Sequence, residues 1–311
     1  MSDRRLRELE RRLEQDPSDQ DALTQAVAAR QRAGLPVPAR WLISVVFDPR
    51  RFDYPEPAAL SVLTPDGRRR SVGNTPAPDG LALPAHKAWW LQPLGPSDRG
   101  VAAAAELLAG EPHVGLSLRP DVTPHGLDAL RRFNGLRRLD LSACPAVDDA
   151  ALAAVAGVVG LGWLDLWGCR RFGADGLARL SGSGLVSLRL AGCAQLDAAA
   201  WPHLAGLPEL VALDLAGCSA LTPAGLRALS ELPALGYLDL RGCSRLDDEA
   251  CATLARLPEL TVLNLSLCPG ITLRGLQALR QAPRLRELWA VGTGLEADAA
   301  AAALPDCAVR T

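Results

Sequence analysis

The sequence lacks long apolar runs, and only one of its basic residues is a lysine. No stretch of about 18 apolar residues occurs, so no segment is predicted to span a membrane. The first residues, MSDRRLRELERR, are charged and have no apolar core, which is unlike a secretory signal and favours a cytoplasmic protein. The bias toward arginine and alanine indicates a GC-rich, bacterial genome. The net charge of −2 at pH 7 excludes a strong overall attraction to nucleic acid or anionic lipid.

Motifs of catalysis are also missing. The chain has no P-loop, no G-x-S-x-G and no H-E-x-x-H, and its four histidines are scattered. Its eight cysteines include no C-x-x-C pair, and they belong to a long chain without a signal, so reduced and buried thiols are expected. The sequence therefore predicts neither an enzyme nor a metal or cofactor site.

What the sequence has in abundance is repetition. Six similar segments recur along the chain: LDLSAC (139–144), LDLWGC (164–169), LRLAGC (188–193), LDLAGC (213–218), LDLRGC (238–243) and LNLSLC (263–268). The leucine that opens each unit recurs every 24 or 25 residues, at Leu136, Leu161, Leu185, Leu210, Leu235, Leu260 and Leu285. A fixed period in this range with the pattern L-x-x-L-x-L-x-x-C is the signature of a solenoid.

The two halves of each unit favour different structures. The L-x-L part alternates with a period of two and predicts a short strand with its leucines on one face. Apolar residues 8 and 11 positions after the cysteine predict one face of a helix, as Leu226 and Leu229 show. The residues expected to cap these helices are Asp148, Asp149, Thr222, Asp247, Asp248 and Thr272. Leu-Pro pairs such as Leu207-Pro208 end several helices and turn the chain toward the next strand.

Energetics explain why the unit is repeated. One unit buries about six aliphatic side chains at roughly 1.5–3 kcal/mol each. Ordering its backbone costs about 1–2 kcal/mol per residue, so a lone unit does not fold. Stacking covers the open sides of each unit and restores the balance. We expect the cysteine to fill a buried corner after the strand, where its weak S–H donor meets a neighbouring backbone carbonyl.

This pattern resembles the cysteine-containing leucine-rich repeats found in the repeat arms of F-box proteins and in many bacterial proteins. The resemblance covers about residues 111–311, and no F-box is seen before it. It implies an α/β fold, a leucine-rich-repeat solenoid with a curved parallel sheet inside and helices outside. It also implies that the protein binds other macromolecules, mostly proteins, and has no chemistry of its own.

The sequence suggests three parts: a helical hairpin (1–35), an irregular β or connector region (36–86), and the repeat domain (87–311). The hairpin would comprise helices at 3–15 and 19–33. The connector would hold a strand at 41–47 and two strands in SVLTPDGRRRSVG around a turn at 65–67. The repeat domain would begin with a capping strand and helix (89–94 and 98–108) and a worn first unit (helix 123–133), and it would end with a strand near 308–310.

The residues between the strand leucines are expected to face outward on the concave side of the sheet. The predicted partner-binding residues on this face are Trp163, Trp167, Tyr237, Trp289, Arg138, Arg189, Arg241, Asp165, Asp214 and Asp239. Exposed aromatic residues mixed with arginine have the composition of binding hot spots. Two alternatives stay open, because the aspartates could be a salt-linked habit of the repeat, and Trp163 and Trp167 could pack on each other over Ala191.

Three functions remain compatible with the sequence. The leading hypothesis is a non-catalytic protein-interaction scaffold that binds a protein or peptide on the concave face. The second is a targeting subunit of an enzyme or defence complex that docks an effector through residues 1–86. The third, an enzyme or nucleic-acid binder acting through residues 37–110, is disfavoured because that region offers only the basic run Arg68-Arg69-Arg70. The oligomeric state cannot be read from the sequence.

Overall fold

The computed structural model describes residues 3–15, 22, 25–26, 50–52, 54–64, 68–77, 80–84, 88–95, 97–108, 111, 114–133 and 135–311. The predicted strand at 41–47 and most of the predicted helix at 19–33 lie outside these residues. The predicted helix at 3–15 is present as α1 (Asp3–Gln15), with Leu6, Leu9 and Leu13 buried.

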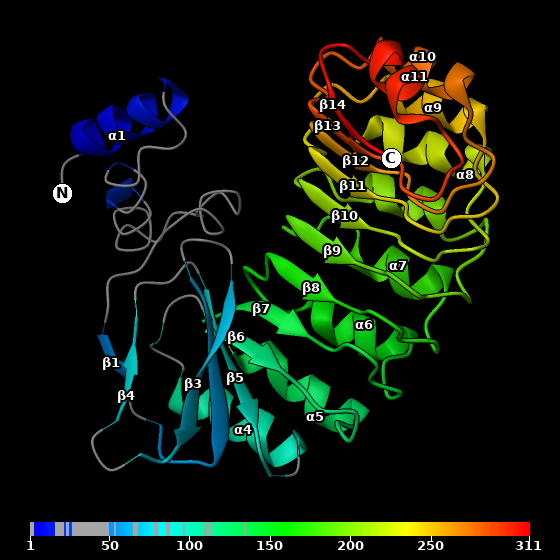
Figure 1. Ribbon diagram of the computed structural model, residues 1–311. Coiled ribbons are helices and arrows are strands. Elements are labelled where there is room, and N and C mark those ends of the chain that lie inside the picture. Colours follow the sequence, from blue (N-terminus) through cyan, green and yellow to red (C-terminus); the bar gives the residue numbers. More distant parts are fainter. Residues whose placement is uncertain are drawn as a thin grey trace.

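The repeats form the expected solenoid. Nine parallel strands are stacked in chain order, one per unit, to form a sheet. Figure 1 shows the helices of the units along one side of this sheet. The strands are β6 (Val114–Ser117), β7 (Leu136–Asp140), β8 (Trp163–Asp165), β9 (Ser187–Arg189), β10 (Ala212–Asp214), β11 (Tyr237–Asp239), β12 (Val262–Asn264), β13 (Glu287–Trp289) and β14 (Ala308–Arg310). From β7 to β14 the middle residues of neighbouring strands pair with each other without a shift, so every unit contributes the same position to each row.

The helical side is less regular than the sheet. It comprises α5 (Pro124–Ala129), η1 (Leu130–Arg132), α6 (Asp149–Ala156), α7 (Ala174–Leu180), η2 (Trp201–Gly206), α8 (Pro223–Leu226), η3 (Arg227–Glu231), α9 (Asp248–Leu254), α10 (Leu273–Leu279) and α11 (Ala297–Ala303). The predicted caps are confirmed at Asp148, Thr222, Asp247 and Thr272, whose side chains each accept a hydrogen bond from a backbone N–H of the first turn. No described helix has the length and apolar character needed to cross a membrane.

Buried leucines and cysteines hold neighbouring units together. The two strand leucines of each unit are fully buried, as Leu213 and Leu215 show. The thiols of Cys169, Cys193, Cys218, Cys243 and Cys268 donate to strand carbonyls of the preceding unit at 3.1–3.4 Å. The structural role predicted for the cysteine is therefore confirmed.

The sheet continues beyond the repeats toward the N-terminus. Strand β5 (Ala88–Pro93) pairs parallel with β6, and β2 (Ala58–Leu63) pairs antiparallel with both β5 and β3 (Arg69–Thr75). These are the predicted capping strand and hairpin, and α4 (Ser97–Leu107) is the predicted capping helix. A separate small sheet joins β1 (Arg50–Phe52) to β4 (Leu81–Leu83). The sequence-based boundary at residue 86 lies between strands of one sheet, and the three-part division stays a prediction.

The thiol column generates a first prediction. Seven of the eight cysteines are buried, and Cys307 is the half-buried one. Burial raises the pKa of Cys193 and Cys218 to about 12, so these thiols stay protonated at neutral pH. We expect an aromatic disulfide reagent at pH 8 to modify at most Cys307 in the folded protein and all eight thiols in 6 M guanidinium. Rapid modification of two or more thiols in the folded protein would contradict this packing.

Candidate binding face

The concave face consists of three rows of outward side chains, supplied by the first and third residues of each strand and by the residue two positions after the strand, which is Trp167 after β8 and Arg241 after β11. From β8 to β13, the first row is Trp163, Ser187, Ala212, Tyr237, Val262 and Glu287. The second row is Asp165, Arg189, Asp214, Asp239, Asn264 and Trp289. Because neighbouring strands lie about 4.8 Å apart, each row is a ladder of adjacent side chains.

The aspartates of the second row have a local structural task. In each case, Oδ1 accepts a hydrogen bond from the backbone N–H two residues further on, as Asp214 does from Ala216 at 2.9 Å. The same bond is made by Asp140, Asp165 and Asp239, and Asn264 makes it with its amide oxygen. Such a side chain–backbone bond fixes the turn that ends the strand. The interpretation of this aspartate as a habit of the repeat is therefore consistent with the geometry.

The second oxygens of these carboxylates are compensated unequally. Arg189 lies between two of them, with Nε 2.9 Å from Asp214 Oδ2 and Nη1 3.2 Å from Asp165 Oδ2. Burial raises the pKa of Asp165, and the Trp167 N–H and Arg189 oppose that shift. Asp239 Oδ2 accepts a hydrogen bond from the neutral amide of Asn264 at 3.1 Å, and no cation lies within 4 Å of it among the described residues. Among the aspartates from β8 to β11, Asp165 and Asp214 are therefore compensated by one shared arginine, and Asp239 by none.

Three of the four predicted aromatic residues are exposed on this face. Trp167, Tyr237 and Trp289 are 46%, 36% and 37% exposed. The guanidinium of Arg189 lies 5.9 Å from the Trp167 ring centre, which is a cation–π distance. Trp289 Nε1 donates to Glu287 at 2.7 Å, and Arg310 approaches the same ring. Large apolar side chains are therefore held in defined positions and left partly in contact with water.

The expectation of an outward, accessible side chain is wrong for Arg138 and incomplete for Trp163. Arg138 is only 5% exposed, and its burial lowers its pKa to about 10. The half-buried Trp163 meets Trp90 of β5 edge-on, with ring centres 6.1 Å apart, although Gly115 and Arg138 stand between them in the sheet. The two rings therefore lean toward each other over the intervening strands. A Cβ atom at Gly115 would lie 2.8 Å from Trp90 Cδ1, so glycine makes room for the ring.

Sequence reasoning missed two members of this region. Arg69, from the basic run at 68–70, lies with its guanidinium 4.7 Å from the Trp90 ring centre and donates a hydrogen bond to Ser117. Leu267 follows the third outward position of its unit and is 49% exposed beside Val291. Its φ of 58° is left-handed, and the equivalent positions of five other units are glycine (Gly168, Gly192, Gly217, Gly242 and Gly292), while Ala143 has a φ of 55° there. A leucine in a glycine position was the available signal.

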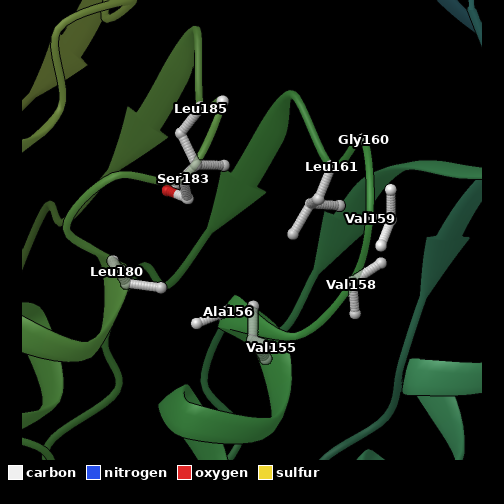
Figure 2. A pocket seen from close by; sticks show the side chains of 10 residues that line it. Val155, Ala156, Val158, Val159, Gly160, Leu161, Leu180, Ser183 and Leu185 are labelled. Atoms are coloured by element: carbon white, nitrogen blue, oxygen red, sulfur yellow. The ribbon is translucent and has the colours of Figure 1, made fainter. Parts of the chain in front are cut away.

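The described residues offer little for catalysis. None of their His, Cys, Asp and Glu side chains form a group of three that could hold a metal ion. Figure 2 shows a pocket of about 160 Å³ between two units, and its lining is aliphatic apart from Ser183. Val159 and Ser183 stand there at the position that Pro208 occupies in a later unit. The pocket contains no titratable side chain.

Comparison with known proteins agrees with the repeat architecture. A family model described as "Leucine Rich repeat" matches residues 257–279, and no curated protein matches. Similar solved structures include the Rad7–Elc1 complex of yeast, with 18% identity, 68% of this chain and 71% of that chain covered, and a TM-score of 0.37. A TLR13–ssRNA13 complex has 22% identity, 64% and 29% coverage, and a TM-score of 0.48. Internalin C2 of Listeria monocytogenes has 20% identity, 70% and 96% coverage, and a TM-score of 0.45. The family match and the solenoid support a leucine-rich-repeat family.

The central arginine generates a prediction about stability and pH. Replacing it in Arg189→Met leaves Asp165 buried without its cation, so the pKa of that carboxyl rises further. A raised folded-state pKa contributes stability at low pH that is lost as the pH rises through it. We therefore expect the variant to lose about 1–2 kcal/mol of unfolding free energy at pH 7 and less at pH 4. The loss is smaller than for a fully buried ion pair because the Arg189 side chain is partly exposed. Urea unfolding at both pH values measures this.

Arg241→Met is the matched control, because Arg241 is exposed and has no carboxylate within 4 Å among the described residues. Its unfolding free energy should change by less than about 0.5 kcal/mol. Equal losses for the two variants, or a larger loss for Arg189→Met at pH 4, would show that Arg189 does not compensate Asp165.

Leu267 generates a second prediction. Glycine adopts the left-handed backbone conformation without strain, so Leu267→Gly should by this effect raise the unfolding free energy by about 1–2 kcal/mol. The greater chain entropy of glycine and the lost contacts of a half-exposed side chain offset about as much. The unfolding free energy should thus change by less than about 1 kcal/mol, whereas Leu263→Ala in the core should cost about 2–5 kcal/mol. Comparable losses would mean that Leu267 is part of the core.

Proposed function

We propose that this protein is a non-catalytic interaction scaffold that binds a protein or peptide on the concave face. The observation that carries the proposal is the exposure of Trp167, Tyr237 and Trp289 on one sheet face. Aromatic side chains bury about 150–250 Å² when they are covered, and most folded chains place them inside. Several large aromatic side chains held in water on one face are typical of an interface.

The scaffold also fixes these side chains before a partner arrives. Tyr237 and Trp289 lie on three-residue strands whose neighbours are in register on both sides, and Trp167 lies in the turn after β8, where its carbonyl accepts a hydrogen bond from the Ala143 N–H of the preceding unit. Their backbone therefore loses little freedom on binding, which lowers the entropic cost of association. The exposed Leu267 and Val291 extend the apolar surface at the β13 end. Leu267 costs backbone strain and gives the fold only partial burial, which favours a role in contacting a partner.

The charges of the face favour a polypeptide over a nucleic acid. Asp165, Asp214 and Asp239 follow one another in the second row, interrupted only by Arg189. A phosphate backbone would approach these carboxylates against their repulsion. A polypeptide can instead present neutral or basic groups to them. The alternative, a targeting subunit that docks an effector through residues 1–86, is less favoured because β2 and β3 continue the repeat sheet through β5.

Peptide selection tests the proposal directly. A random 12-residue peptide library displayed on phage is selected on the full-length protein, and the affinities of enriched peptides are measured by fluorescence anisotropy. We expect Trp167→Ala with Tyr237→Ala to weaken binding by about tenfold or more, since hot-spot truncations each cost about 1–2 kcal/mol or more. Their melting temperature should stay within a few degrees, because both side chains are partly exposed.

Leu273→Ala is the control, because Leu273 is an exposed apolar residue on the helical side. It should leave the affinities unchanged. Peptides that bind both variants like the wild type, or that are lost only with Leu273→Ala, would remove the concave face as the binding site.

A further inference from the structure

The carboxylates of the second row differ in what faces their outer oxygens. Asp140 Oδ2 accepts a hydrogen bond from the Ser117 hydroxyl and lies 3.8 Å from Arg69 Nη1. Asp165 and Asp214 share Arg189. Asp239 is the one row aspartate in the described part of the chain that has no cation within 4 Å; the Asn264 amide donates to its outer oxygen, and the Tyr237 hydroxyl is close enough to hydrogen-bond to its side chain. This carboxylate is therefore hydrogen-bonded by neutral groups but has no cation beside it.

An exposed aromatic ring stands beside that charge. Tyr237 lies two residues before Asp239 on β11, so both side chains project from the same face. Burial raises the pKa of Tyr237, and the negative charges of Asp239 and Asp214 and a side-chain hydrogen bond to Asp239 raise it further. A cation beside this pair is attracted by two groups: by the ring through its quadrupole and by the carboxylate through its negative charge.

The approach to this pair is open on both sides. The register neighbours of Tyr237 are Ala212 and Val262, and neither can shield it with a long side chain. The neighbours of Asp239 are Asp214, engaged by Arg189, and Asn264. Burial raises the pKa of Asp239 and the negative charge of Asp214 adds to this, whereas the hydrogen bonds from the Arg241 backbone N–H and the Asn264 amide, and the charge of Arg241, oppose it. A second positive charge brought from outside would relieve the repulsion between the two neighbouring carboxylates.

We propose that Tyr237 and Asp239 form the subsite that receives a basic side chain, an arginine or a lysine, of the bound peptide. This inference rests on the proposed function and adds the chemistry of the partner. The charge of the occupant follows from complementarity, since Asp239 lacks an internal counter-ion while Asp165 and Asp214 have one. Binding in this orientation turns the exposed ring of Tyr237 into one wall of the subsite and the carboxylate into its base.

The test uses a variant that moves the charge without removing it. Asp239→Asn combined with Asn264→Asp exchanges the two partners, so an amide still donates to a carboxylate across β11 and β12. Each new residue also keeps an oxygen for its backbone N–H, as both types do now. The same phage library is selected on the full-length wild type and on this exchange variant. We expect one peptide position to be enriched in arginine or lysine on the wild type.

A double-mutant cycle then assigns the contact. Changing the enriched basic residue of the peptide to glutamine should weaken wild-type binding about tenfold, and it should change binding to the exchange variant less than about threefold. The peptide substitution keeps the test valid even if the exchange lowers stability. Asp175→Asn, which removes an exposed charge on the helical side, is the matched control and should leave affinity unchanged.

The outcomes separate the two proposals. If binding depends on Trp167 but peptides show no basic preference, or if the cycle is additive, the basic subsite is overturned while the binding face stands. If no peptide depends on Trp167 or Tyr237, the proposed function itself fails. If a 12-nucleotide single-stranded RNA binds this face and peptides do not, the occupant is a nucleic acid and the subsite is also overturned.

Discussion

The burial of leucine between units stacked in register is the interaction on which the rest of the structure depends. A single unit has too little apolar surface to offset the entropy of ordering its chain, and both of its flat sides are open. Stacking covers those sides with identical neighbours, and the cysteine thiols add a hydrogen bond from each unit to the carbonyl of the one before. Because every unit must match its neighbours, strand length and register are the same from β8 to β14.

That constraint determines what the concave face can offer. Each strand from β8 to β13 is three residues long, so its first and third side chains project outward while its central leucine is buried. The outward positions contribute little to the core, and the chain can vary them at small cost. Tyr237 and Trp289 are such variations, and Trp167 and the unusual Leu267 are variations in the turn that follows a strand. The regular packing of the buried leucines thus leaves the residue types on the concave face free to vary.

The periodic features could be predicted from the sequence because they depend on local spacing. The leucine strands, the helix caps at Asp148 and Thr272, the role of the cysteines and the final strand at Ala308–Arg310 all follow from patterns within one unit. The features that were missed depend on side chains from distant units. The edge contact between Trp90 and Trp163 spans four strands, and it accompanies the burial of Arg138 in a row expected to be open. No pattern within a single unit specifies how far a long side chain leans.

The aspartate row shows how one residue can serve the fold and binding together. The inner oxygen of each carboxylate is committed to the turn after its strand, so the fold requires an oxygen at this position but not a charge, as Asn264 demonstrates. The outer oxygen is left for a neighbour or a partner. Arg189 contacts two outer oxygens at once, so one positive charge is shared by two carboxylates, and Asp239 is left with no cation within 4 Å among the described residues. Under the proposed function, the position of this arginine along the row selects the strand on which a basic ligand group is most favoured.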